Sequence, residues 1–359
     1  MAQNIKYADF NLATGANTGF SKTDAWKTIA DVIAGEAAND RVRINNESSA
    51  STTTNAPTTN GTIGNLITWI AFDFATDTEV TLANWSRYGG TINSVTIDGT
   101  GAAAGQFGLE ISNGHKYREF IGIKIINGFD RCWRLRGILS QVSLLMCEAE
   151  NALNYGFNIV GTSTVRHCHA TSCTSHGFYA ANQDTCLYFC TAKDCTSGFY
   201  NLRRNARCCV AIGCDIGFRL GSIGSEAYEC VAYDCTTAVQ CAATSQLIPV
   251  DSMIVFECTN ILDLAVGTLV YMKNVKYKTI TAISIGAGSY IDEGGNELLT
   301  DDPMVDPAND NFTSVAAVTE LVNLEEQITE DTIAYLQAGL TQEVVAGAKR
   351  RPRIRTHGV

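Results

Sequence analysis

The stretch Cys168-His-Ala-Thr-Ser-Cys173, followed by Gly177-Phe178, decides the fold of this chain. The same pattern of C-x-A-x-x-C and then G-F returns at 190–199 and at 209–218, and in altered form at 230–239. A fixed period of about twenty residues marks one structural unit that stacks on copies of itself. The sequence therefore predicts a solenoid.

Apolar residues fill equivalent places in each copy. The first cysteine and the alanine two residues later share one face of a short strand, because side chains alternate along a strand with a period of two. A second strand carries the aromatic residue that follows the glycine, and a third apolar column lies three residues before the first cysteine. The expected interior ladder consists of Cys147, Cys168, Cys190, Cys209, Cys230, Cys173, Cys195, Cys214, Cys235, Phe157, Phe178, Phe199 and Phe218.

Three short strands in each copy leave no room for a helix, which excludes leucine-rich and helical solenoids. The remaining fold is all-β: a right-handed, single-stranded parallel β-helix with three sides, whose equivalent residues stack at a strand spacing of ~4.8 Å. The glycine before each aromatic residue, such as Gly177, suits either a positive φ or close backbone packing.

The N-terminal end of the chain differs from its middle. Residues 1–38 are expected to form an arm and a short capping helix, in which Trp26, Ile29 and Ile33 share one face. Such a cap protects the open edge of a solenoid from aggregation. The β-helix itself is expected over 39–314.

The C-terminal end is predicted to lie outside the β-helix. Apolar residues at helical spacing over 315–348 predict a helical segment that caps the solenoid or pairs with a neighbouring subunit. Residues 349–359 are expected to form an extended tail, since Pro352 stops a helix. A disordered solubilising tail is one interpretation, and the other is an anchor on an acidic partner surface or on a neighbouring copy. The anchoring cations would be Lys349, Arg350, Arg351, Arg353 and Arg355.

Three stretches resemble the right-handed parallel β-helix proteins of phage and environmental bacterial genomes. They are the opening at 25–44, the coils with Cys-x-Ala and Gly-Phe-Tyr, and the closing Asp302-Pro-Met-Val-Asp-Pro307 with Asn311-Phe312. The opening departs from the family pattern, with Asn39-Asp40 in place of Gly-Asp. The resemblance implies the fold and, from the way such prisms pack in threes, a homotrimer. The family includes virion proteins, adhesins and glycan-cleaving enzymes.

Charge and hydropathy limit the partners. A net charge of −11 gives no general attraction to nucleic acid or to an anionic membrane, so neither is expected as a partner. No run of eighteen apolar residues predicts a transmembrane span. The first residues lack the charged and apolar regions of a signal peptide, which predicts synthesis in the cytoplasm.

The fourteen cysteines call for an explanation. His167, His169 and His176 beside Cys168 and Cys173 invite a zinc site, but the two cysteines are five residues apart and recur in coils that lack histidine. No metal and no cofactor is therefore expected. Disulfides between stacked coils stay open, because stacked Cα atoms fall within bridging range. Buried free thiols that act as small apolar fillers are favoured.

Catalytic residues are hard to find in the sequence. A glycosidase needs two carboxyl groups at ~5 Å or at ~6.5–9.5 Å, and Asp194 and Asp234 are expected two coils apart, at ~9.6 Å. The motifs of the family's pectin hydrolases are absent, so no catalytic residue is predicted. Arg134 and Arg136 are expected to be exposed rim charges. Outward aromatic residues that could contact sugar, but that also suit ordinary coil edges, are Tyr179, Tyr200 and Trp133.

These observations favour a non-enzymatic structural protein of a bacteriophage virion, a projecting β-helix that decorates or stabilises the capsid or forms a spike. Its expected partners are two further copies of itself and the major capsid or tail proteins of the same particle. One alternative is a tail-spike polysaccharide depolymerase or lyase. Another is a bacterial adhesin that is exported by a non-Sec route and binds a surface glycan.

Overall fold

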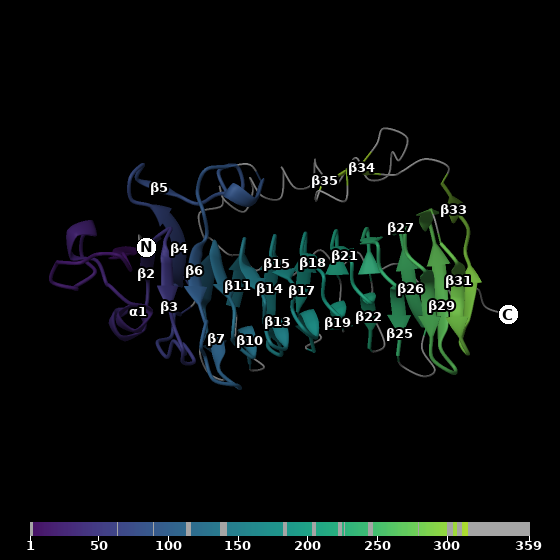
Figure 1. The fold of residues 1–359 in the computed structure, drawn as a ribbon, viewed down its shortest axis with the longest axis horizontal. Coiled ribbons are helices and arrows are strands. Elements are labelled where there is room, and N and C mark those ends of the chain that lie inside the picture. The colour runs from purple at the N-terminus through teal and green to yellow at the C-terminus, as the bar shows by residue number, and fades with distance from the viewer. Residues whose placement is uncertain are drawn as a thin grey trace.

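The computed structural model describes residues 3–299, except 63, 89, 113–115, 137–141, 182–184, 203–205, 222–224, 226, 243–246 and 279, together with 304–306 and 311–314. The chain winds into three long sheets, and in the middle of the molecule each coil adds one strand to each sheet (Figure 1). Neighbouring coils pair in parallel, for example β13 (Tyr155–Ile159) with β16 (His176–Ala180). The predicted three-sided parallel β-helix is thereby confirmed.

Sheet A is the largest of the three sheets and has 13 strands. Its strands are β1 (Asn4–Ala8), β2 (Asp40–Asn45), β4 (Ile67–Asp73), β5 (Thr78–Glu79), β8 (Arg118–Ile121), β11 (Val142–Leu145), β14 (Ser163–Arg166), β17 (Cys186–Tyr188), β20 (Ala206–Arg207), β23 (Ala227–Tyr228), β26 (Leu247–Asp251), β29 (Leu269–Lys273) and β32 (Ser289–Asp292). Only β5 pairs antiparallel, with β4.

Sheet B has 11 strands: β3 (Ser48–Ala50), β6 (Val95–Asp98), β9 (Ile123–Ile126), β12 (Glu148–Glu150), β15 (His169–Thr171), β18 (Thr191–Lys193), β21 (Val210–Ile212), β24 (Val231–Tyr233), β27 (Ile254–Phe256), β30 (Lys276–Lys278) and β33 (Glu297–Leu298). Sheet C has nine: β7 (Phe107–Ile111), β10 (Arg131–Leu135), β13, β16, β19 (Ser197–Leu202), β22 (Ile216–Leu220), β25 (Thr237–Cys241), β28 (Asn260–Leu264) and β31 (Ala282–Gly286). A separate pair, β34 (Met304–Asp306) and β35 (Asn311–Ser314), is antiparallel.

Like residues stack on like residues inside the prism. Phe178 pairs with Phe157 and with Phe199 in register, and the ring centroids are 4.6 and 5.0 Å apart with nearly parallel planes. Ala170 and Ala192 pair in the same way in sheet B. All of these side chains are buried. The repeat therefore acts through continuous apolar columns that run along the axis.

The cysteine columns mark the corners of the prism. Met146 (φ 55°) precedes Cys147, and Asp194 (φ 53°) precedes Cys195, so each of these cysteines follows a left-handed corner residue. The Cys147 thiol donates to the carbonyl oxygen of Leu145 at 3.5 Å, across the corner. The same arrangement recurs at Cys168, Cys173, Cys190, Cys209, Cys214, Cys230 and Cys235. All fourteen cysteines are free thiols.

The glycine column serves close packing. A Cβ on Gly177 would lie 2.8 Å from the carbonyl oxygen of Gly198 and 2.9 Å from the Cβ of Ala192, closer than such atoms approach one another. Its φ is not in the left-handed region. Of the two roles that the sequence leaves open for this glycine, the structure shows close backbone approach.

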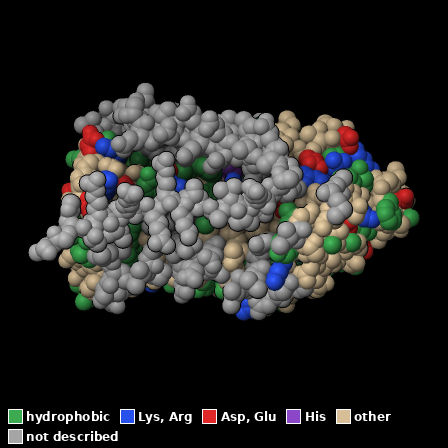
Figure 2. Space-filling view, turned by 180° about the vertical axis from the view of Figure 1, so that it is seen from behind, with side chains coloured by type: hydrophobic (Ala, Val, Ile, Leu, Met, Phe, Trp, Pro, Cys, Tyr) green, Lys and Arg blue, Asp and Glu red, His purple; other side chains and the backbone are tan. Residues whose placement is uncertain are grey.

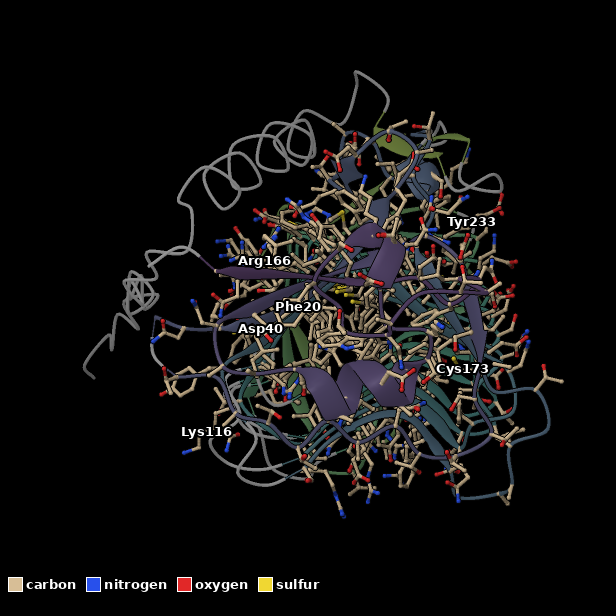
Figure 3. The ribbon with its side chains drawn as sticks, turned by 90° about the vertical axis from the view of Figure 1, so that its left-hand side faces the viewer. Phe20, Asp40, Lys116, Arg166, Cys173 and Tyr233 are labelled. Carbon is tan, nitrogen blue, oxygen red and sulfur yellow. The ribbon has the colours of Figure 1, made fainter. Side chains whose placement is uncertain are left out.

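The capping helix is shorter than predicted. A 3-10 turn, η1 (Lys22–Asp24), comes first, and helix α1 (Ile29–Gly35) begins only after Thr28, whose hydroxyl accepts the backbone N–H of Asp31. Trp26 lies before the helix and forms an isolated bridge with Ala8. Figure 3 looks into this end, where α1 lies across the interior and Arg166 and Tyr233 lie on different sides of the prism.

The N-terminal arm also contributes to the β-helix. Strand β1 pairs in parallel with β2 and starts sheet A, so the sheet begins before residue 39. The polar segment that follows β3 is held against the first coils at Asn55. This residue is 5% exposed, and its side-chain amide donates to the carbonyl oxygen of Gly108 at 2.8 Å. A second 3-10 turn, η2 (Ser86–Tyr88), lies between β5 and β6.

A buried ion pair joins this cap to the first coils. The guanidinium of Arg118 donates to the carboxylate of Glu36, and both side chains are fully buried. The indole N–H of Trp69 donates to the same carboxylate at 2.8 Å, and Arg118 also donates to the carbonyl oxygen of Thr59. The charges are therefore well supplied with hydrogen bonds, as buried charges need to be.

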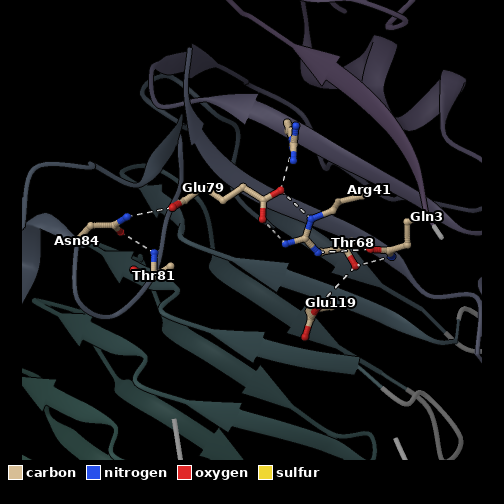
Figure 4. A network of polar contacts seen from close by, with 8 residues as sticks. Gln3, Arg41, Thr68, Glu79, Thr81, Asn84 and Glu119 are labelled. Carbon is tan, nitrogen blue, oxygen red and sulfur yellow. Dashed lines mark hydrogen bonds and ion pairs between the residues drawn. The ribbon is translucent and has the colours of Figure 1, made fainter. Parts of the chain in front are cut away.

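A polar network on the outward face of sheet A holds the β4–β5 hairpin (Figure 4). Arg41 donates to both carboxylate oxygens of Glu79, at 2.6 and 2.8 Å, and Arg43 donates to one of them at 2.8 Å. The Asn84 side-chain amide donates to the backbone carbonyl of Glu79. The arginines hold the pKa of the Glu79 carboxyl below its usual range, although its burial works in the other direction.

The predicted helical segment over 315–348 and the basic tail over 349–359 lie outside the described residues, and both stay predictions. No helix in the described part of the chain is long and apolar enough to cross a membrane.

Candidate functional site

The outward face of sheet C carries a row of stacked side chains along the solenoid axis. In β16, His176 before the glycine and Tyr179 after the inward Phe178 lie on this face, and the residues in register with them do so in the neighbouring strands. Contacts join residues from six successive strands. We call this set the sheet C stack: Phe107, Arg131, Tyr155, His176, Tyr200 and Arg219.

His176 lies at the centre of the sheet C stack. The ring of Tyr155 covers one face, with centroids 5.0 Å apart, and the ring of Tyr200 lies 3.9 Å away, both within 12° of parallel. Arg131 lies over Tyr155 at 5.0 Å, and Arg219 lies over Tyr200 at 4.6 Å. The row therefore presents ring edges, hydroxyl groups and guanidinium groups to solvent.

The environment of His176 keeps its imidazole neutral. Burial lowers the pKa of His176 to about 4, the nearby positive charge of Arg219 lowers it further, and a hydrogen bond to the backbone of Ser175 opposes both. Within the described part of the chain, its buried Nδ1 has no hydrogen-bond partner. A neutral imidazole can accept a proton at neutral pH, which is what a general base does.

The three arginines of this face differ in their partners. Arg131 pairs with Asp130 at 3.3 Å, and Arg134 pairs with Glu110 at 3.0 Å. Arg219 has no ion-pair partner among the described residues. Arg219 is therefore the cation that remains available for a negatively charged ligand.

Arg134 was expected to be an exposed rim charge, and that expectation is wrong. Its side chain is 12% exposed, because it packs over the ring of Phe107 at 4.0 Å and against Glu110. Burial lowers its pKa, and the neighbouring Arg136 and Arg131 contribute in the same direction. Trp133 also differs from its prediction: it is fully buried in the interior, and its indole N–H donates to the carbonyl oxygen of Glu148.

Strand β19 carries a bulge beside the stack. The register with β22 shifts between Tyr200 and Leu202, and Asn201 between them has a φ of 55°. The side-chain amide of Asn201 donates to the hydroxyl of Tyr179 at 3.5 Å. Bulges are common beside functional sites, where they redirect a side chain. Here the bulge brings an amide to the phenol of the neighbouring coil.

The histidines that invited a zinc site point in different directions. Cys168 is part of the interior, whereas His169 lies on the outward side of sheet B, with its ring 5.4 Å from that of Trp85. His167 occupies the left-handed corner before Cys168 and stacks on Phe189. Among the described residues, no group of three or more His, Cys, Asp or Glu side chains is arranged to hold a metal ion.

Sheet A carries a smaller row of a similar kind. Arg166 lies over Tyr188 at 5.2 Å, and Arg207 lies over Tyr228 at 4.9 Å. Among the described residues, no ring contact extends this row to a histidine. The row on sheet A is therefore a weaker candidate site than the longer stack on sheet C.

The N-terminal end offers no patch of a single charge sign. It is seen on the right of Figure 2, where charged groups of both signs lie close together. Sheet C is therefore also a better candidate site than this end of the molecule.

The fold is similar to that of solved enzymes. Pectate lyase Pel9A matches with a TM-score of 0.51 and 11% identity, over 88% of this chain and 90% of that one. The GH136 lacto-N-biosidase from Eubacterium ramulus has a TM-score of 0.45 and 9% identity, over 82% of this chain and 67% of that one. A rhamnogalacturonan lyase has a TM-score of 0.42 and 11% identity, over 83% and 85%. No family model and no curated protein matches the chain.

The prediction of a non-enzymatic protein is contradicted by this comparison, because Pel9A, which shares the fold over most of both chains, is a lyase. The missing pectin-hydrolase motifs exclude only one way in which such a fold carries catalysis. At 11% identity the likeness shows the fold alone, so the activity has to be argued from this chain's own residues. The virion role, the capsid partners and the homotrimer gain no support and stay predictions.

Sequence reasoning missed the sheet C stack for a physical reason. Its members occupy the outward positions of the repeat, and these do not repeat in residue type. The sequence marks Tyr200 as an outward aromatic residue, but it carries no sign that His176 and Arg219 contact its ring. The available signal was the register itself, which places the residue before each glycine in one outward column.

Proposed function

We propose that this protein is a polysaccharide-degrading enzyme that binds its substrate along the outward face of sheet C. The observation that carries the proposal is the sheet C stack. It offers hydroxyl or guanidinium donors in four of its six coils, at Arg131, Tyr155, Tyr200 and Arg219, with the His176 imidazole between the two tyrosines. The coils repeat at the strand spacing of ~4.8 Å, which is comparable to the length of one sugar ring. A linear polymer of sugars can therefore repeat its contacts from coil to coil.

Other polymers fit this face less well. Single-stranded nucleic acid needs free aromatic faces on which bases stack, but the rings of Tyr155, His176 and Tyr200 cover one another. The net charge of −11 also opposes nucleic acid. An extended peptide adds to the edge of a sheet, whereas this site lies on the face of one. A polysaccharide needs neither a free ring face nor a sheet edge.

The first test is depolymerisation by the purified full-length chain. Polygalacturonate, alginate, hyaluronate and neutral dextran would be incubated with the protein, and new reducing ends counted. Any mode of chain cleavage creates reducing ends, so this readout does not depend on the mechanism. We expect cleavage of at least one of these polysaccharides. No new reducing ends with any of the four would overturn the proposal, and binding without cleavage would favour a glycan-binding protein instead.

The site is tested by removing two hydroxyl groups of the stack. The double variant Tyr155→Ala/Tyr200→Ala loses two hydrogen-bonding groups, each contributing ~0.5–1.5 kcal/mol, so kcat/KM should fall about 5- to 150-fold. The matched control is Tyr188→Ala/Tyr228→Ala, which removes two tyrosines under arginines on sheet A. The control should keep its activity. An equal loss in both double variants would place the site elsewhere.

A further inference from the structure

We propose that the reaction at this site is β-elimination on a uronate-containing polysaccharide, with His176 as the base, Arg219 at the uronate carboxylate and Tyr179 as the proton donor. The inference rests on the proposed function and gives it a substrate class and a mechanism. It uses only side chains of the outward face of sheet C and its neighbouring bulge.

The arrangement of charges on sheet C favours elimination over hydrolysis. Glycoside hydrolysis needs two carboxyl groups within ~10 Å of each other. The acidic residues in the outward columns of the described strands are Glu110 in β7 and Asp263 in β28, seven strands apart, or ~34 Å at the strand spacing. Glu110 is engaged by Arg134, and Asp263 accepts a hydrogen bond from Gln240. The centre of the face is cationic and aromatic instead.

The electrons and protons of the step balance within this set of groups. The imidazole of His176 takes the proton from the carbon next to the uronate carboxylate. The electron pair of that C–H bond becomes the new carbon–carbon double bond as the bond to the glycosidic oxygen breaks. Tyr179 gives its hydroxyl proton to the departing oxygen. Proton exchange with solvent then resets both side chains, and no oxidant, reductant or further reactant is consumed.

His176 meets the requirements of the base. Tyr155 and Tyr200 cover the faces of its ring, and Nδ1 is buried, so a substrate can reach His176 only at the ring edge that carries Nε2. The stacked neighbours also hold the ring in one orientation, which a proton transfer needs. Because burial keeps its pKa at about 4, the imidazole is unprotonated at neutral pH, although it is a weaker base than an ordinary imidazole.

Arg219 suits the carboxylate of the substrate. Removing a proton beside a carboxylate builds up negative charge, which a nearby cation stabilises. Arg219 lies over Tyr200, one coil beyond the ring that covers His176, and it has no ion-pair partner among the described residues. A guanidinium can bind a carboxylate through two parallel hydrogen bonds. Arg131 is less available because it pairs with Asp130.

Tyr179 suits the proton donor. Its phenolic oxygen accepts the Asn201 amide at 3.5 Å, which leaves its own hydrogen free to donate. Its ring centroid lies 6.2 Å from that of His176, on the same strand and the same face. The base and the donor are thus held side by side by one strand and by the bulge of the next.

The pH profile follows from the groups that face His176. They are Tyr155 on β13, Tyr179 on β16, Tyr200 on β19 and Arg219 on β22. Arg219 is the charged member of this set and disfavours the imidazolium. With its pKa at about 4, the base stays unprotonated down to about pH 5, so kcat/KM should hold from pH 7 to pH 5 and fall near pH 4. A histidine with an ordinary pKa would lose activity near pH 6.5.

The decisive experiment analyses the products made by the unmodified full-length chain from polygalacturonate and alginate. Elimination gives a carbon–carbon double bond, seen by ultraviolet absorbance and olefinic proton resonances. It also gives chain ends lighter by one water than hydrolysis products. We expect these unsaturated ends. Reducing ends without unsaturation would leave the depolymerase standing and overturn elimination. No cleavage of these two uronate polymers would also overturn elimination, and the test with all four polysaccharides then decides whether the protein is a depolymerase.

Variants assign the roles. His176→Gln should lower kcat about 100- to 10,000-fold, the range for losing a general base, and Tyr179→Phe should lower kcat with KM little changed. Arg219→Gln should lose activity on uronate polymers, whereas the matched control Arg207→Gln on sheet A should keep it. Thermal unfolding checks that each variant is folded. A folded His176→Gln variant with full activity would overturn the assignment.

Discussion

Replacing Arg118 with methionine is expected to destabilise the protein by ~3–5 kcal/mol. The change leaves the Glu36 carboxylate buried and without its cation, since both side chains are fully buried in the native pair. The carbonyl oxygen of Thr59 also loses its hydrogen-bond donor, the guanidinium of Arg118. Urea unfolding followed by tryptophan fluorescence measures the loss.

Two control variants show that the buried charge is the cause. Lys22→Ala breaks the exposed pair between Lys22 and Asp77, whose side chains are 35% and 70% exposed, and should change the free energy of unfolding little. The double variant Glu36→Leu/Arg118→Met removes both buried charges and should recover part of the stability. The account of the cap is wrong if Arg118→Met costs no more than Lys22→Ala.

Replacing Phe178 with alanine is the second change with a large expected effect, a loss of ~3–5 kcal/mol. Phe178 is fully buried and stacks on Phe157 and Phe199, so its removal opens a cavity that neighbours on both sides share. Because each coil contacts mainly its neighbours, the middle coils should also exchange their amide hydrogens faster.

Phe20→Ala is the matched control, because this phenylalanine is 72% exposed and only Lys6 lies over its ring. Its loss should stay within ~1 kcal/mol. Equal losses for Phe178→Ala and Phe20→Ala in urea unfolding would contradict the stacked interior.

The interior of the β-helix follows from the sequence because burial constrains each column. A residue such as Ala192 or Phe178 touches its equivalents above and below, so one residue type recurs and the period becomes visible. Outward positions have no such constraint. Tyr155 and His176 lie next to each other because they pair in register, whereas His176 stacks on Tyr200 diagonally across two strands. Neither contact leaves a repeat in the sequence.

Local hydrogen bonding explains why the capping helix leaves out Trp26, which the sequence places on its apolar face. Trp26, Ile29 and Ile33 have helical spacing, but the Thr28 hydroxyl caps the helix at Asp31 and the chain before it pairs with β1. Apolar spacing does not record where a helix begins. The candidate site escaped sequence analysis for a similar reason, because a search for known motifs cannot detect side chains that come together from outward positions of successive coils.

The most direct test of the central claim is a crystal structure of the full-length His176→Gln variant with a uronate oligosaccharide. The account predicts a sugar chain along the outward face of sheet C, with hydroxyl contacts from Tyr155 and Tyr200 and a carboxylate on Arg219. An oligosaccharide bound on sheet A, over Tyr188 and Tyr228, would contradict it.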